Sequence, residues 1–181
     1  MSKTQRRSAA FAFLVILLLA APADAQDGRS PHVRPLSGMQ HLVDEAARRS
    51  PAIREWLDRL ESLDVIVYIR ANAFMPLDLD GRVGLLSAGG IHRYLVIDLA
   101  CPRVERSQMA TLGHELFHAI EIAEEPSVVN SSTLADLYSR IGVQTDDSPG
   151  RRTFETQAAV AAGERARREL LMTTVSHGHG T

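Results

Sequence analysis

The stretch TLGHELFHAI, residues 111–120, holds two histidines four positions apart and a glutamate directly after the first. Residues four apart on an α-helix lie one turn apart on the same face, so His114 and His118 point in directions about 40° apart. Two imidazoles in this arrangement can bind one metal ion. Glu115 points about 100° away from His114, where it can accept a proton from metal-bound water without binding the metal itself.

The residues around this motif predict a helix over residues 105–124 that packs against the core with one side. Its apolar side chains fall within about 100° of arc opposite the two histidines, so the helix would present both imidazoles on the side away from the core. Apart from Glu115 and the two histidines, residues 111–120 carry no acidic or basic group that could compete for a metal ion. The apolar face consists of Met109, Leu112, Leu116, Ala119, Ile120 and Ala123.

The motif alone does not distinguish a metal site from two ordinary helix histidines. A sequence of this length and composition contains HExxH by chance in roughly one or two cases per hundred. A catalytic zinc ion usually has three protein ligands and a water molecule. A third ligand elsewhere in the chain would therefore favour the metal site.

A downstream helix, expected over residues 152–172, offers Glu155 as this third ligand. Small side chains fall within about 60° of Glu155 on the predicted helix, which would let another helix approach closely. A carboxylate within such a stripe would be buried and would need a partner or a metal ion. The alternative is a solvated glutamate that the helix dipole favours near the helix start. The small residues are Ala158, Ala159, Ala162 and Ala166.

The stretch 111–120 resembles the extended signature of the zincin metallopeptidases, in which HExxH has an uncharged setting. A ligand glutamate on a downstream helix is similar to the gluzincin pattern, especially that of its small minimal members. The resemblance implies that His114, His118 and Glu155 bind Zn²⁺ and that Glu115 is the catalytic base. It also implies a zincin-like fold and a peptide or protein substrate.

Two departures limit this resemblance. The metzincin pattern does not fit, because Glu121 and Glu124 stand where that family has a glycine and a third histidine. Glu121 is also poorly placed on the same helix to complete a tetrahedron. Many gluzincins carry an aspartate four residues after the ligand glutamate, where this chain has Ala159. The group that orients the ligand histidines is therefore expected to come from elsewhere.

The first 25 residues are typical of a secretory signal peptide. A positively charged start precedes an unbroken apolar run at 9–21, and Ala23 and Ala25 fit a cleavage site. The pattern predicts cleavage after Ala25 and export to the periplasm or the exterior. An uncleaved anchor helix is the alternative, but the run is short for a full membrane span.

Charge argues against two classes of partner. The whole chain has a net charge of −2, and removal of Lys3, Arg6, Arg7 and Asp24 takes away a net +2, which leaves the exported chain near −4. This balance offers no basic surplus for nucleic acid. No apolar span remains after Ala25, so no membrane association is expected after cleavage.

The remaining chain predicts one α+β domain. Residues 26–36 are predicted to form a linker, 37–172 the domain, and 173–181 a flexible tail in which His177 and His179 could bind metal loosely. The 45% apolar composition is sufficient for a buried core.

Within the domain, Ser50-Pro51 predicts an N-cap and a helix that runs to about residue 61. The apolar run 64–70 predicts a strand buried on both faces. Residues 82–99 predict a hairpin around Gly89-Gly90. With helices at about 105–124, 132–141 and 152–172, these elements predict a small antiparallel or mixed β-sheet packed against helices.

The rest of the predicted site is less specific. Strand 91–99 is the candidate edge along which a peptide substrate would add as a further strand, with the Gly89-Gly90 turn as a lip of the cleft; an ordinary hairpin is the alternative. Tyr138 is the first candidate donor to an oxyanion to test, although the favoured interpretation is a tyrosine that packs in the fold. Further candidate donors are His92, Tyr94 and Arg152, and Asp136 is a weaker candidate near the metal.

These observations predict a secreted, zinc-dependent metallopeptidase. The alternative is a secreted zinc-binding module of the same fold without turnover, and a third possibility is a protein without metal. Cys101 is the only cysteine, which excludes an internal disulfide and fits a small buried hydrophobic residue.

Overall fold

The computed structural model describes residues 31–146 and 153–175. The predicted signal peptide, Arg152, His177 and His179 lie outside these residues. The strands are β1 (Val33–Pro35), β2 (Val65–Asn72), β3 (Gly81–Gly89), β4 (His92–Ala100), β5 (Val143–Asp146) and β6 (Thr153–Glu155), and the helices are α1 (Gln40–Arg49), α2 (Pro51–Glu61), α3 (Glu105–Ala123), α4 (Ser131–Ile141) and α5 (Gln157–Val175).

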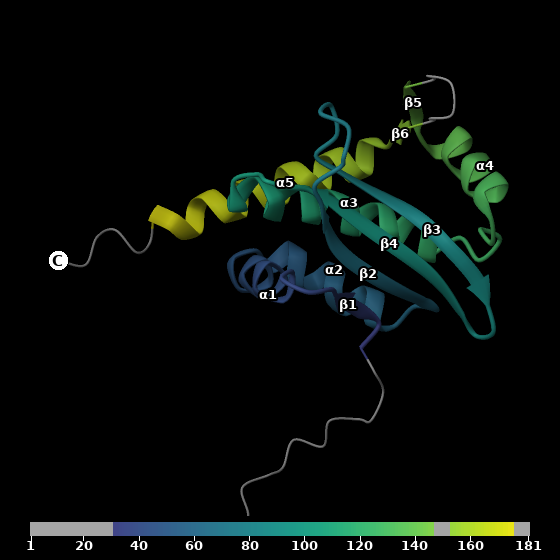
Figure 1. Cartoon of the computed structure of the whole chain (residues 1–181), viewed down its shortest axis with the longest axis horizontal. Coiled ribbons are helices and arrows are strands. Elements are labelled where there is room, and N and C mark those ends of the chain that lie inside the picture. Colours follow the sequence, from purple (N-terminus) through teal and green to yellow (C-terminus); the bar gives the residue numbers. More distant parts are fainter. Residues whose placement is uncertain (1–30, 147–152, 176–181) are drawn as a thin grey trace, which may run out of the picture. The chain divides into compact units, whose positions relative to one another are not determined.

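The main sheet is four-stranded and mixed, with the order β1-β2-β4-β3 (Figure 1). Strands β1, β2 and β4 run parallel, whereas β3 returns from β2 and pairs antiparallel with β4. The predicted α+β class with a small mixed sheet is confirmed. The prediction of β4 as the edge strand is wrong, because β4 pairs on both sides and β3 forms the edge.

Two predicted segment boundaries are also wrong. Residues 33–35, predicted as part of a linker, form β1 and pair with β2. The strand was not predicted because Pro35 lacks an amide donor and so argues against a strand, but an edge strand tolerates proline. Residues 173–175, predicted as part of a flexible tail, belong to α5, and the Thr173 hydroxyl donates to the Arg49 carbonyl at 2.9 Å.

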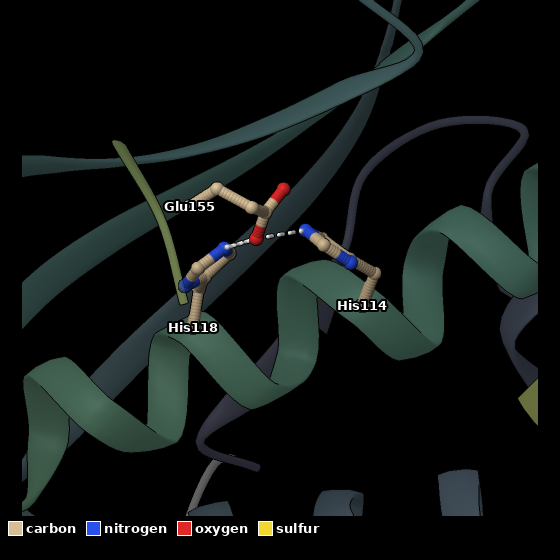
Figure 2. A group of neighbouring side chains, drawn as sticks. All are labelled: His114, His118 and Glu155. Carbon is tan, nitrogen blue, oxygen red and sulfur yellow. Dashed lines mark hydrogen bonds and ion pairs between the residues drawn. The ribbon is translucent and has the colours of Figure 1, made fainter. Parts of the chain in front are cut away.

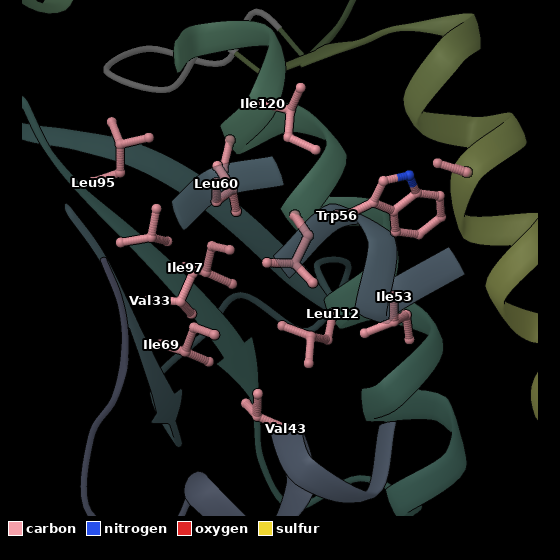
Figure 3. Close-up of a cluster of buried hydrophobic side chains, with 14 of the residues drawn as sticks. Val33, Val43, Ile53, Trp56, Leu60, Ile69, Leu95, Ile97, Leu112 and Ile120 are labelled. Atoms are coloured by element: carbon pink, nitrogen blue, oxygen red, sulfur yellow. The ribbon is translucent and has the colours of Figure 1, made fainter. Parts of the chain in front are cut away.

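The hydrophobic core lies between one face of the sheet and α2 and α3 (Figure 3). The predicted apolar face of α3 is buried there, with Leu112 and Leu116 fully inaccessible to solvent. Ser50 caps α2 as predicted, since its hydroxyl accepts the Ile53 amide. The strands contribute Val33, Val65, Val67, Ile69, Leu95, Ile97 and Leu99 to this core.

The buried Arg93 fixes the C-terminal end of α3 to the sheet. Its guanidinium donates to the carbonyl oxygens of Ile122, Ala123 and Glu125 at 2.6–2.8 Å. Carbonyls of the last helical turn lack partners within the helix and carry partial negative charge, so a cation there satisfies both needs. Because Arg93 belongs to β4, this contact sets how far α3 extends along the sheet.

Helix α5 packs closely along α3 through small residues. Ala159, Ala162 and Ala166 are buried, which confirms most of the predicted stripe, although Ala158 is exposed. A Cβ added at Gly113 of α3 would lie 2.7 Å from the Ala166 Cβ, a distance that real carbons do not adopt. Among the described residues, no helix is both long enough and apolar enough to cross a membrane.

The close contact between Gly113 and Ala166 gives a stability prediction. Alanine usually favours a helix interior over glycine by about 1 kcal/mol, but we expect Gly113→Ala to lower the free energy of unfolding by about 1–3 kcal/mol through overpacking. Ala166→Gly in the same chain should recover part of that loss. Urea denaturation of the two single variants and the double variant tests this. If the two changes in the free energy of unfolding simply add in the double variant, the contact between the two residues does not cause the loss.

Candidate metal centre

The three residues predicted as metal ligands meet at one point (Figure 2). The Nε2 atoms of His114 and His118 each lie 3.2 Å from the same carboxylate oxygen, Oε1 of Glu155. The three potential ligand atoms all lie within 4.8 Å of one another. Tetrahedral zinc with bonds of about 2.0–2.2 Å separates its ligand atoms by roughly 3.3–3.5 Å. The donor types and their spacing therefore fit one metal ion.

Glu155 reaches this point from a strand and not from a helix, so that part of the prediction is wrong. Residues 153–155 form β6, which pairs with β5, and α5 begins at Gln157. The helical face calculated around Glu155 therefore does not exist at that residue. The small residues act further along α5, where a Cβ added at Gly163 would lie only 3.1 Å from the His114 Cβ.

Glu121 supplies the orienting group that the sequence did not locate. The Nδ1 atom of His118 lies 2.8 Å from Glu121 Oε2, on the opposite side of the ring from Glu155. The other oxygen of Glu121 accepts the Thr156 hydroxyl at 2.7 Å. Glu121 was considered only as a metal ligand, and its spacing of three residues from His118 was the available signal for this contact.

The hydrogen bonds within this group shift the pKa values of His118 and Glu155 in opposite directions. Burial opposes the charged form of His118, but hydrogen bonds to Glu121 and Glu155 outweigh it and raise the pKa of His118 to about 9. Burial would likewise raise the pKa of Glu155, yet hydrogen bonds from His114 and His118 lower it to about 2. Without a metal ion, the Glu155 carboxylate thus carries negative charge between two imidazoles. A metal ion could bind between the carboxylate oxygen and the two ring nitrogens.

Glu115 lies beneath the edge strand and is buried, with 5% of its surface exposed. Burial raises the pKa of Glu115 to about 7, against the opposing influence of His118 and His114. The backbone at Val83 also opposes this rise in pKa, to a smaller extent. Gly81 permits the close approach of the strand, because a Cβ there would lie 2.8 Å from Glu115 Oε1 and 2.5 Å from Thr111 Cγ2. Glu115 is therefore held beside the metal centre and is not part of its ligand group.

Tyr138 lies behind His118. Its hydroxyl is 3.3 Å from Nδ1 of that ring and donates to the His118 carbonyl at 3.4 Å. Burial raises the pKa of Tyr138 well above its usual value, which keeps the hydroxyl protonated. Because Nδ1 faces away from Glu155, this geometry supports the packing interpretation and not the predicted role as an oxyanion donor.

The other predicted residues lie apart from the centre. His92 and Tyr94 alternate on β4 with core residues and so point to the opposite face of the sheet, where the His92 ring contacts His32. Asp136 is exposed on α4. The Gly89-Gly90 turn follows the far end of β3, roughly 25 Å from Gly81 at 3.3 Å per residue, so it does not form a lip at this site.

Comparison of the chain with models of known protein families, with curated proteins and with solved structures found no match.

The raised pKa of Glu115 gives a pH prediction for the metal-free protein. Its protonated form contributes stability that is fully present below about pH 4.5 and is lost as pH rises through about 7. We expect Glu115→Gln to flatten the fall in Tm between pH 5 and 7.5 and to exceed the wild type in Tm at pH 7.5. Thermal unfolding in a chelator measures this. The exposed Glu164→Gln on α5 is the control, and equal slopes in wild type and Glu115→Gln would contradict the prediction.

Proposed function

We propose that this protein is a zinc-dependent metallopeptidase with a zincin-like fold. The supporting observation is the convergence of His114, His118 and Glu155 on one point, with the buried Glu115 beside it. Two neutral nitrogen ligands and one carboxylate are a common set for catalytic zinc, and three protein ligands leave a position for water or substrate. When bound, zinc supplies a Lewis acid that lowers the pKa of a ligated water molecule and polarises a carbonyl.

Glu115 is the proposed general base. Its carboxylate would accept the proton of the attacking water and then donate it to the nitrogen of the leaving amine. Burial of Glu115 favours its protonated form, which is the form that the base reaches after it has taken the proton from water. The position of Gly81 over the carboxylate restricts the movement of Glu115, which would keep the transferring oxygen close to the ligand group.

The edge strand β3 is the proposed substrate support. Among the described residues it pairs with β4 alone, so its other edge is free to accept an extended peptide as a further strand. Strand β3 starts at Gly81, directly above Glu115. A peptide aligned on the first residues of β3 would therefore pass over the catalytic centre. This role moves the predicted substrate edge from 91–99 to 81–89.

The zinc-binding module without turnover remains the second candidate, and one observation favours it. Of the described residues predicted to stabilise an oxyanion, Tyr138 lies behind His118, and His92 and Tyr94 lie on the other face of the sheet. A peptidase normally places a donor where negative charge develops on the carbonyl oxygen.

Metal analysis and kinetics together test the proposal. We expect about one equivalent of zinc in the purified protein, and a clear loss of zinc in His118→Ala and Glu155→Ala. Glu115→Gln should keep its zinc but lose peptidase activity by about 10²–10⁴-fold, because only the proton transfer is removed. Mass spectrometry for zinc and a peptide library measure the two properties.

The exposed Glu164→Gln serves as the matched control and should keep both zinc and activity. Zinc with no turnover on any peptide, unaffected by Glu115→Gln, would favour the binding module. Less than about half an equivalent of zinc would contradict both proposals.

A further inference from the structure

We propose that Thr156 is a positioning residue of the metal centre: together with Glu121 it fixes the tautomer and orientation of His118, and it couples this to the start of α5. This inference rests on the metal site of the proposed function. It concerns the Thr156 hydroxyl, which bonds to Glu121 and to the Ala159 amide and to none of the three proposed ligands.

Thr156 is buried, with 3% of its surface exposed, and its hydroxyl makes two hydrogen bonds. The oxygen accepts the Ala159 amide at 3.0 Å, which is the side-chain cap of the first turn of α5. The same hydroxyl lies 2.7 Å from Glu121 Oε1. A carboxylate can only accept, so the single hydroxyl proton must go to Glu121. The direction of both hydrogen bonds is therefore fixed.

Glu121 transmits this fixed direction to His118. Its second oxygen lies 2.8 Å from Nδ1, and an ionised carboxylate requires that Nδ1 carry a proton. A neutral His118 then has its lone pair on Nε2, the atom that faces Glu155 at 3.2 Å. Nε2 is thereby presented to a metal ion.

Consecutive residues thus act on both nitrogens of one ring. Glu155 faces Nε2 directly, and Thr156 reaches Nδ1 through Glu121. The Thr156 amide also donates to Glu155 Oε1 at 3.0 Å. The dipeptide 155–156 consequently supplies the ligand Glu155 and also orients the ligand His118. A shift of the start of α5 would disturb both.

A purely structural cap makes a different prediction. If Thr156 only capped α5, its replacement would lower the free energy of unfolding by about 0.5–2 kcal/mol and leave Zn²⁺ affinity unchanged. Asn130 provides a matched comparison. Its side-chain oxygen caps α4 by accepting two backbone amides, and it makes no contact with the ligand group in the described structure.

The experiment measures Zn²⁺ affinity by competition with a chelator in Thr156→Val, Thr156→Ser, Glu121→Gln and Asn130→Ala. Loss of an orienting partner typically costs about 10–100-fold in metal affinity. We expect that loss in Thr156→Val and in Glu121→Gln, and no larger loss when both are combined, because they interrupt one path. Thr156→Ser should restore affinity, and Asn130→Ala should lose stability alone.

A second readout follows the His118 Nδ1 proton in the zinc-loaded protein by nitrogen-15 NMR. Its exchange with solvent should be faster in Thr156→Val and Glu121→Gln than in the wild type and in Asn130→Ala. If Thr156→Val does not fold, Glu121→Gln carries both measurements. Wild-type Zn²⁺ affinity in Thr156→Val or Glu121→Gln, or additive losses in the double variant, would overturn this inference alone. A wild type that binds no Zn²⁺ would overturn the proposed function as well.

Discussion

The close approach of α5 to α3 is the constraint on which the candidate site depends. Helix–helix distance is set by the side chains at the contact, and here a glycine faces an alanine at Gly113 and Ala166 while Gly163 faces His114. A larger residue at any of these positions would push α5 outward and carry Glu155 away from the histidines. The small residues thus matter less for the core than for the position of one carboxylate.

A second constraint acts from the sheet side. Gly81 allows β3 to rest on Thr111 and Glu115 in the middle of α3, and Arg93 ties the C-terminal end of α3 to β4. Helix α3 is therefore fixed to the strands at its middle and at its C-terminal end, and α5 packs along it. Glu115 is buried on this helix, and among the described residues no arginine or lysine forms a salt bridge with it, so burial raises the pKa of Glu115 to about 7.

The sequence predicted those parts of the fold and site that depend on local periodicity. The helix around His114 and His118, its apolar face, the Ser50 cap and the buried strand all follow from spacing within one element. Strand order was open to error, because β4 is apolar whether it lies at an edge or in the centre. The reason for choosing Glu155 was wrong, since its helix begins two residues later, although the structure does bring its carboxylate to the two histidines. The Glu121–Thr156 contact joins residues 35 apart, and no periodicity within one element encodes such a contact.

The separation of the ligands has a further consequence for how the molecule would come apart. His118 and Glu155 are 37 residues apart, and the segment between them includes α4 and β5. An ion shared by these two side chains would close that segment into a loop, as a disulfide would in a chain with more than one cysteine. Cross-linking a loop of this size restricts the unfolded chain by about 4 kcal/mol in the chain-entropy description. A bound ion would therefore act as a cross-link within the C-terminal half. After its removal, α4 and the β5–β6 ribbon would unfold before the main sheet.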